Sequence, residues 1–386
     1  MISFSRSLPA ILCFVCLLLA STVGDAFAVK EKSSESGPGL AVMAGQMIMA
    51  GFRGTGDTSL GEDLSYLLED IRRGHVGGVI LFDRDVITRK AGRNIVSLKQ
   101  VKKLNAMLQS AAPTPLFIAV DQEGGKVRRL KEAHGFPALP SAEELGKGSA
   151  TQTRQAGEKN GALLHGLGIN LNFAPCLDVN SNPASPAIGA LGRSFSPDAN
   201  KVAEHGLAYA EGLFSAGVLP CYKHFPGHGS AKNDTHLGLA DITATWNDKE
   251  LVPYRRILPK SPPAMVMPGH IVHKKMTGDM PASLSPKVIE ELLRRKLGWQ
   301  GVVITDDLQM QAVEGHYSTK EALRLAIVAG ADILLLGNNL RHDPQEARKA
   351  HACLMELVAE GKISKERIRI SYERIMRLKK EAGIVK

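Results

Sequence analysis

The sequence predicts an α/β fold in which eight parallel strands close into a single-domain (β/α)8 barrel of the TIM type. Eight short apolar runs recur along the chain, and each is followed by a loop and a segment with helical periodicity. The apolar residues in these runs are continuous rather than alternating, which is typical of strands buried on both faces of a parallel sheet. Eight such units in about 340 residues match a (β/α)8 barrel with some enlarged loops.

The predicted strands follow one another at regular intervals. In chain order they are residues 47–52, 75–82, 115–121, 169–179, 218–225, 264–272, 301–308 and 331–338. Amphipathic segments lie between them, and in residues 59–74 one helical face carries Leu60, Leu64, Leu67, Leu68 and Ile71. A doubly wound open sheet is the alternative, but no Gly-x-Gly-x-x-Gly turn follows the first run. Because no Pro/Ser-rich linker follows residue 338, residues 41–386 are expected to form one domain.

The first 28 residues have the features of a secretory signal peptide. Arg6 precedes an apolar run over residues 8–20 that is short for a membrane span, and a small-residue cleavage site follows at residues 26–28. An uncleaved membrane anchor is the alternative. After signal removal, the polar residues 29–40 are expected to be a flexible leader. The sequence thus predicts an exported protein, periplasmic or secreted, without a stable membrane span.

Charge and cysteine content argue against two classes of protein. The formal net charge is +9, and much of it lies in the helical segment 364–383, whose basic back is expected to face solvent. We find no nucleic-acid-binding motif or interleaved aromatic pattern. Three cysteines remain outside the signal, Cys176, Cys221 and Cys353, and an odd number argues against a disulfide scaffold. A bridge between Cys176 and Cys221 stays possible.

Polar side chains follow five of the eight predicted strands. They are Asp121 to Gly125, Lys223 and His224, His270, Thr305 to Asp307, and Asn338 and Asn339. The carboxyl ends of barrel strands meet on one face, where barrel enzymes carry their active sites. We therefore predict a shared polar pocket there.

The loop KHFPGHGSAKNDTH, residues 223–236, holds three histidines. His224 and His228 have the spacing of a helical zinc motif, but Pro226 and Gly227 between them prevent the helix that would place both on one face. A zinc site assembled from separate strand ends stays an alternative. Asp234 and His236 instead suggest a pair in which the carboxylate orients the imidazole and raises its basicity, so that it can donate and accept a proton.

Four strings carry a resemblance to a known family. DQEGGKVRRL, IGALGRSF, KHFPGHGSAKNDTH and GVVITDDLQM, in this order and spacing, resemble the glycoside hydrolase family 3 β-N-acetylhexosaminidases of the peptidoglycan-recycling, single-domain type. The resemblance covers nearly all of the chain beyond the signal, so residues 41–386 would be the catalytic barrel domain. It implies the same (β/α)8 fold. We expect no metal and no cofactor.

The resemblance also implies residue roles. Asp306 matches the family's nucleophile, His236 its acid/base and Asp234 the partner of that histidine. The positions that contact N-acetylglucosamine are Asp121, Arg129, Arg193, Lys223 and His224. Arg128 or Lys126 would compete with Arg129 if the alignment were displaced, and Asp307 is either a helix-capping carboxylate or a site residue.

The chemistry implied is retaining hydrolysis of a terminal β-N-acetylglucosaminide by a protein expected to be a monomer. Asp306 would attack the anomeric carbon while His236 protonates the leaving oxygen, and water would then enter with His236 as base. Two departures from the family pattern are the export signal and the Pro-Gly pair in the sixth strand. The alternatives are a non-catalytic cell-wall sugar-binding barrel, a metal-dependent hydrolase, another β-glycoside as substrate, and phosphate as acceptor. The leaving group is not determined by these patterns.

Overall fold

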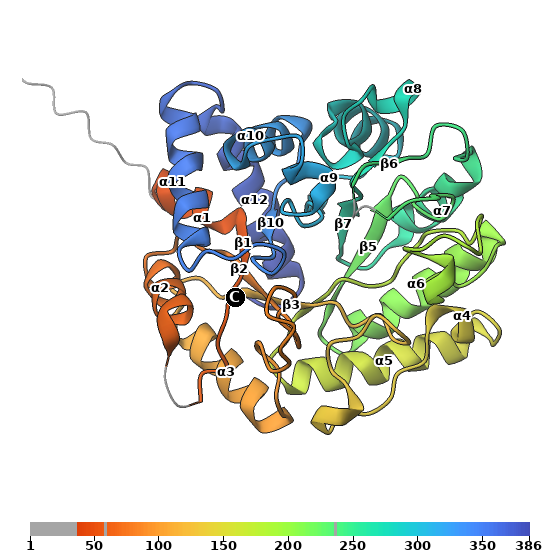
Figure 1. The fold of residues 1–386 in the computed structure, drawn as a ribbon, viewed down its shortest axis with the longest axis horizontal. Coiled ribbons are helices and arrows are strands. Elements are labelled where there is room, and N and C mark those ends of the chain that lie inside the picture. The colour runs from red at the N-terminus through yellow and green to blue at the C-terminus, as the bar shows by residue number, and fades with distance from the viewer. Residues whose placement is uncertain (1–36, 58–59, 235–237) are drawn as a thin grey trace, which may run out of the picture. The chain divides into compact units, whose positions relative to one another are not determined.

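The computed structural model describes residues 37–57, 60–234 and 238–386. Residues from Pro38 to Lys386 form one compact unit, and the predicted signal peptide lies outside the described residues. This unit is the predicted barrel, with parallel strands inside and helices outside (Figure 1).

All eight predicted strands are present, although most are shorter than the apolar runs that predicted them. They are β1 (Ile48–Gly51), β2 (Gly78–Leu81), β3 (Phe117–Val120), β4 (Leu171–Asn172), β5 (Leu219–Phe225), β7 (Met265–Pro268), β9 (Val302–Val303) and β10 (Leu334–Leu336). They pair in the order β10-β1-β2-β3-β4-β5-β7-β9, and each printed pairing is parallel. A parallel bridge between Ile304 and Ile333 joins the two edge strands.

The sixth run differs from its prediction. Residues 264–272 were expected to form one strand, but β7 ends at Pro268, and Ile271–Val272 form the separate strand β8, which pairs with β6 (Ala240–Asp241). Proline has no amide hydrogen to donate to a neighbouring strand, and Gly269 then donates to Phe225 O at 3.0 Å. The Pro-Gly pair therefore turns the chain out of the barrel at its carboxyl end.

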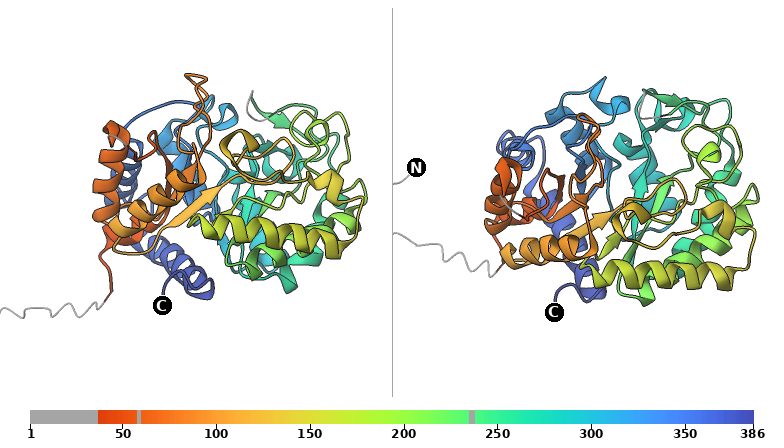
Figure 2. Two further views of the ribbon diagram at one scale, coloured as in Figure 1. Left: turned by 90° about the horizontal axis from the view of Figure 1, so that it is seen from below. Right: turned by 60° about the horizontal axis from the view of Figure 1, so that its bottom comes forward.

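One main helix follows each barrel strand (Figures 1 and 2). These are α2 (Gly61–Arg72), α3 (Leu98–Ala111), α5 (Ala150–Gly166), α6 (Ala199–Ser215), α7 (Val252–Ile257), the π-helix η6 (Lys287–Lys296), α10 (Thr319–Ala329) and α11 (Glu346–Ala359). Two more helices, α1 (Leu40–Gln46) and α12 (Lys365–Glu381), pack against each other. No helix in the described part of the chain is both long and apolar enough to cross a membrane.

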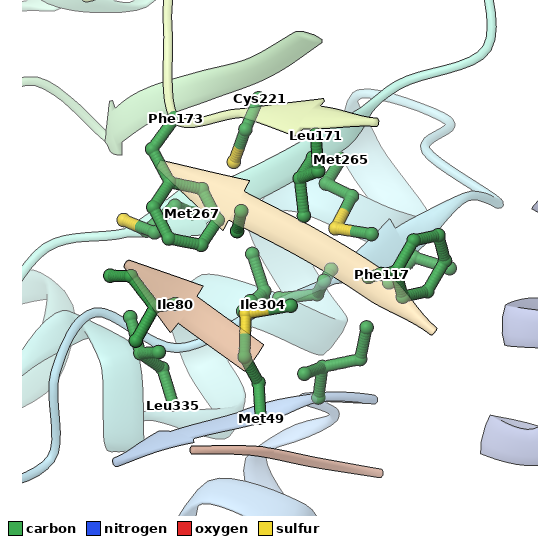
Figure 3. Close-up of a cluster of buried hydrophobic side chains, with 14 of the residues drawn as sticks. Met49, Ile80, Phe117, Leu171, Phe173, Cys221, Met265, Met267, Ile304 and Leu335 are labelled. Atoms are coloured by element: carbon green, nitrogen blue, oxygen red, sulfur yellow. The ribbon is translucent and has the colours of Figure 1, made fainter. Parts of the chain in front are cut away.

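Side chains from every strand region fill the barrel interior (Figure 3). The labelled residues are Met49, Ile80, Phe117, Leu171, Phe173, Cys221, Met265, Met267, Ile304 and Leu335. Because the other face of each strand is also covered by helices, the strands are apolar throughout, as the continuous runs predicted. Cys176, Cys221 and Cys353 are free thiols, so the bridge between Cys176 and Cys221 that the sequence left open is not formed.

A buried carboxylate joins the end of the chain to the barrel. Asp332, just before β10, is fully buried and accepts hydrogen bonds from Arg294 Nη2 at 2.7 Å, Val303 N at 3.0 Å, Ser371 Oγ at 2.9 Å and Arg374 Nη1 at 3.1 Å. These donors come from η6, β9 and α12. Asp332 is thus a single acceptor on which three elements converge.

Asp332→Ala is expected to lower the free energy of unfolding by about 3 to 5 kcal/mol, because it leaves the buried Arg294 without its closest carboxylate. Urea titration of the two proteins measures the difference. Glu356→Ala is the control, since its ion pair with Lys320 lies on the surface and its loss should cost about 1 kcal/mol or less. Equal effects of the two substitutions would contradict this role of Asp332.

Candidate active site

A cavity of about 360 Å³ opens at the carboxyl ends of the barrel strands. Six residues singled out from the sequence line it together: Asp121, Arg129, Arg193, Lys223, His224 and Asp306. They come from four separate parts of the chain, after β3, before α6, in β5 and after β9. The predicted shared pocket is therefore present.

Lys223 lies between two carboxylates at the floor of this cavity. Its Nζ is 2.8 Å from Asp121 Oδ1 and 2.7 Å from Glu123 Oε1, and its side chain is 3% exposed. Burial alone would lower the pKa of Lys223, but the two carboxylates raise it above its usual value. The ammonium is therefore held charged, and its position is fixed from two sides.

Glu123 in turn joins Lys223 to Arg193. Arg193 Nε and Nη2 donate to its two carboxylate oxygens at 2.8 and 2.7 Å, a bidentate pair. Burial would raise the pKa of Glu123, but Arg193 and Lys223 together hold it at about 2. Arg193 Nη1 also donates to Ala187 O at 2.9 Å, so the guanidinium is held in one orientation.

Asp178, which the sequence analysis did not select, fixes His224. This fully buried carboxylate accepts from His224 N at 3.2 Å and lies 2.7 Å from His224 Nδ1, and it also accepts from His228 N at 2.7 Å. Burial would raise the pKa of Asp178, but His224 holds it well below its usual range. With the Nδ1 proton directed at Asp178, His224 Nε2 is left as an acceptor, and Arg193 Nη2 lies 3.4 Å from it.

Three potential metal ligands lie together at this point. Cys176, Asp178 and His224 offer ligand atoms within 4.8 Å of one another, and within the described residues no other such group occurs. Cys176 Sγ donates to Asp178 Oδ2 at 3.0 Å, and His224 Nδ1 lies 2.7 Å from that oxygen. We interpret the group as a hydrogen-bonded support for His224.

A second buried histidine lies beside His224. His228 is 3% exposed, lines the cavity, and neither of its ring nitrogens has a hydrogen-bond partner among the residues that the structure describes. Burial lowers its pKa to about 4, so the ring is neutral near pH 7. It therefore offers one donor and one acceptor in this wall of the cavity.

Glu250 forms hydrogen bonds with the segment that directly follows Asp178. Its carboxyl accepts from Ser181 Oγ at 3.1 Å and Val179 N at 3.4 Å, and the residue is fully buried. Burial raises the pKa of Glu250 to about 8, and the nearby Asp178 adds to this effect. Glu250 is therefore protonated at neutral pH.

Asp306 and Asp307 follow β9 and have different surroundings. Both line the cavity, and Asp306 Oδ1 accepts from Asp307 N at 2.8 Å. Asp307 Oδ1 accepts from Gln309 N at 3.1 Å and Gly337 N at 2.9 Å. A Cβ at Gly337 would lie 2.2 Å from Asp307 Oδ2, so only glycine permits this approach. Asp307 caps no helix, because α9 (Gln311–Glu314) has Met310 at its N-cap and no side-chain cap hydrogen bond. Its contacts instead tie the segment after β9 to Gly337, so we interpret Asp307 as a positioning group in the cavity wall.

Of the three basic residues weighed for this position, Lys126, Arg128 and Arg129, only Arg129 lines the cavity. Its Nη2 is 3.4 Å from Asp121 Oδ2, and its guanidinium lies 6.0 Å from the Phe82 ring centroid. Arg128 pairs with Glu132 at 2.8 Å, and Lys126 donates to Ala190 O in an exposed contact. The alignment that matches Arg129, rather than Arg128 or Lys126, to a sugar-contacting position of the family therefore corresponds to the arginine that lines the cavity.

The predicted acid/base pair is described only in part. Asp234 is half-buried and is the last described residue before the gap, whereas His236 lies outside the described residues. The pairing of these two residues therefore stays a prediction.

Comparison with known proteins defines the family. Residues 40–378 match the model of the glycosyl hydrolase family 3 N-terminal domain. The chain belongs to this family. It is 38% identical to a β-hexosaminidase of Tolumonas auensis, covering 70% of this chain and 78% of that protein. It is 35% identical to β-hexosaminidase A of Pseudoalteromonas piscicida, covering 87% of this chain but only 60% of that protein.

A solved structure has the same fold. It is a glycoside hydrolase family 3 β-N-acetylglucosaminidase from Paenibacillus, with a TM-score of 0.80, 37% identity, and coverage of 90% of this chain and 63% of that one. The predictions of a family 3 barrel and of a glycoside hydrolase are confirmed at the level of the family.

The burial of Glu250 predicts a pH-dependent stability. The pKa of Glu250 is about 8 in the folded protein and near 4.5 in the unfolded chain. The stability that protonation of Glu250 contributes is therefore fully present below pH 4.5 and is lost as the pH rises through 8. Glu250→Gln stays neutral, so its melting temperature relative to the wild type should be higher at pH 8 than at pH 5. Differential scanning calorimetry at both values measures this, with Glu356→Gln as an exposed control. If Glu250→Gln and the wild type differed in melting temperature by the same amount at both pH values, the raised pKa of Glu250 in the folded protein would be contradicted.

Proposed function

We propose that this enzyme is a retaining exo-β-N-acetylglucosaminidase that removes terminal N-acetylglucosamine from peptidoglycan fragments. The observation that carries the proposal is that Asp306 shares one cavity with Asp121, Arg129, Lys223 and His224. A carboxylate suited to attack an anomeric carbon thus faces donors and acceptors suited to sugar hydroxyls. The names of the related enzymes support an acetamido sugar as substrate.

In the first step, the Asp306 carboxylate attacks the anomeric carbon while His236 gives a proton to the leaving oxygen. The glycosyl ester on Asp306 is then hydrolysed by a water that His236 deprotonates, so the configuration is retained. Asp234 orients His236 and stabilises its charged form.

The other polar residues hold the terminal sugar. Asp121 accepts hydrogen bonds from hydroxyls, and Lys223, Arg193 and Arg129 donate to hydroxyls or to the acetamide. His224 accepts through Nε2. The buried pairs with Glu123 and Asp178 hold these groups in place before the substrate binds. Export to the periplasm or beyond, as the N-terminal segment predicts, would expose the enzyme to cell-wall fragments.

Asp306→Asn is expected to lower kcat for p-nitrophenyl β-N-acetylglucosaminide by about a thousandfold or more, because the amide is a poor nucleophile. Release of p-nitrophenol measures the loss, and Asp279→Asn on an exposed turn should leave kcat within a factor of about two. The wild type should be unaffected by a chelator. Activity surviving in Asp306→Asn would overturn the nucleophile assignment, and chelator sensitivity would favour a metal-dependent hydrolase.

His236→Ala should distinguish leaving groups. p-Nitrophenol leaves without much protonation, whereas a sugar hydroxyl requires an acid, so kcat should fall about tenfold or more further for chitobiose than for the p-nitrophenyl glycoside. Assays of released N-acetylglucosamine and p-nitrophenol measure the two reactions. Equal losses on both substrates would remove His236 from the acid role.

Three alternatives have separate outcomes in the same assays. If phosphate is the acceptor, sugar 1-phosphate accumulates when phosphate is added to the wild type. If the barrel only binds sugars, no glycoside is cleaved although N-acetylglucosamine binds. Cleavage of a β-glucoside in preference to the acetamido sugar would keep the mechanism and change the substrate.

A further inference from the structure

We propose that the surface formed by the hairpin after β2 and the first turns of α3 binds the face of an anionic lipid bilayer. The hairpin comprises residues 83–93, and the helix begins at Leu98. We call this region the basic-apolar surface, and its members are Val86, Ile87, Arg89, Lys90, Val96, Leu98, Lys99, Lys102 and Lys103. The inference does not rest on the proposed function, because it concerns what the outside of the protein contacts and not what the cavity cleaves.

Exposed apolar side chains are concentrated on this surface. Among the residues that the structure describes, six large apolar side chains are exposed, and four of the six are Val86, Ile87, Val96 and Leu98. Their exposed fractions lie between 41% and 51%. Single exposed apolar residues are common, but four within residues 86–98 form a patch, and such a patch marks a site that contacts a partner or a membrane.

The exposed charged residues of this surface are all basic. Arg89, Lys90, Lys99, Lys102 and Lys103 are exposed, and none of them has an ion pair with a described residue. Residues 86–111 contain no aspartate or glutamate. In the hairpin, the carboxylate of Asp85 is 4% exposed and already paired with two arginines. The positive charge of the surface is therefore available to an anionic partner.

Hydrogen bonds hold the apolar tip of the hairpin in a fixed place. Asp85 accepts from Thr88 N at 2.8 Å and from Thr88 Oγ1 at 2.9 Å. From the loop after β10, the side chain of Asn339 accepts from Val86 N at 3.0 Å. An ordered turn thus presents Val86 and Ile87 to solvent, although burial of these side chains would be favourable.

The lysines of α3 lie beside the apolar residues. Lys99, Lys102 and Lys103 are three or four residues apart in the first turns of the helix, so they share one face with Leu98. The residues of these turns that face the protein interior are Gln100, Val101 and Leu104.

The hairpin and the helix are continuous with each other. A Cβ at Gly92, at the end of the hairpin, would lie 3.4 Å from Val96 Cγ2, so Val96 packs against the hairpin directly before the helix starts. In the left view of Figure 2, the orange hairpin rises above the carboxyl ends of the strands on the side where α3 lies. The apolar and the basic residues therefore belong to one surface.

The combination of aliphatic and basic side chains fits an anionic bilayer. Anionic lipids attract Lys and Arg near the membrane surface, and each such residue strengthens binding by about fivefold. Aliphatic side chains enter the boundary between headgroups and acyl chains. A soluble polyanion would use the cations alone and leave the apolar residues in water. The surface therefore favours a membrane over a charged polymer.

Membrane binding would place the cavity beside the bilayer. Val86 lines the cavity and is half exposed at its mouth. Glycans held close to the lipid headgroups would then reach the cavity. Such contact would be peripheral, since the described part of the chain holds no helix that could cross a membrane.

Vesicle sedimentation tests the inference with the chain from residue 29, which contains the compact unit Pro38–Lys386. Vesicles of equal parts phosphatidylglycerol and phosphatidylcholine are compared with vesicles of phosphatidylcholine alone. The wild type should bind the anionic vesicles about tenfold or more tightly than the neutral ones. Raising NaCl from about 50 mM to about 300 mM should weaken binding to the anionic vesicles, because salt screens exposed charges.

Two variants separate the contributions of charge and apolar contact. The triple change Lys99→Gln, Lys102→Gln and Lys103→Gln should weaken binding to the anionic vesicles by about twentyfold or more. The double change Val86→Ser and Ile87→Ser keeps every charge and should weaken it by about tenfold, because two aliphatic side chains no longer enter the bilayer.

A matched control removes the same number of charges elsewhere. Lys260, Lys287 and Lys296 are exposed and have no ion pair with a described residue. Changing all three to glutamine should leave binding to the anionic vesicles within about twofold of the wild type, if the basic-apolar surface makes the contact. Equal melting temperatures verify that each variant is folded.

Each outcome supports or overturns the inference. No binding to the anionic vesicles, equal binding to both kinds of vesicle, or equal losses in the two triple variants would overturn it. If the α3 lysines matter but Val86→Ser with Ile87→Ser has no effect, the surface binds anionic polymers and the bilayer proposal fails. No step of this test needs a glycoside, so failure of the hydrolase proposal and failure of this inference are separate results.

Discussion

The site depends on one buried interaction, the contact of Lys223 with Asp121 and Glu123. Lys223 is nearly inaccessible to solvent, and an ammonium in such a place would lose its proton unless carboxylates compensated for burial. Glu123 helps to keep the Lys223 ammonium charged and at the same time holds Arg193 in a bidentate pair. Buried acidic residues therefore position the cationic groups that would bind a sugar, and little reorganisation is needed when the substrate enters.

The barrel is what brings these charges together. Asp121 and Glu123 follow β3, Lys223 lies in β5, and Asp178 comes from the segment after β4. These segments are neighbours because the strands pair in the order β3-β4-β5. On the other side, Asp307 bonds Gly337 N after β10, and His270 Nε2 lies 2.8 Å from Asp307 O. These contacts fix Asp307, whose backbone N–H in turn donates to Asp306 Oδ1.

Local sequence predicted the strands well because burial on both faces leaves a continuous apolar run, and all eight runs contain a strand. It overestimated the length of the sixth strand, because β7 ends at Pro268 although the apolar run continues beyond it. Some site residues could be selected because they lie at the ends of predicted strands or in the strings that resemble the family. These residues are Asp121, Lys223, His224 and Asp306. Glu123 was included in the predicted polar strand end but received no role, and Asp178 was not selected. The importance of both residues comes from partners 46 to 100 residues away.

The same limit applies to the segment after β2 that lines the cavity. Arg84 and Val86 have no sequence signal beyond an ordinary polar loop, and only their hydrogen bonds with Asn339, more than 250 residues away, place them at the cavity. His228 was considered for its spacing to His224, but the useful fact is that its neutral ring is buried in the cavity wall. In each case the deciding information is a contact made across the barrel.

The central claim is that Asp306 forms a covalent glycosyl ester, and trapping that ester tests it most directly. A 5-fluoro-N-acetylglucosaminyl fluoride would be incubated with the wild type, because its good leaving group favours formation of the ester while the fluorine at C5 slows its hydrolysis. Peptide mass spectrometry would then locate the label. One sugar is expected on the peptide that contains Asp306, attached to the Asp306 side chain. A label on Asp307 or another carboxylate, or turnover of the reagent with no labelled peptide, would contradict it.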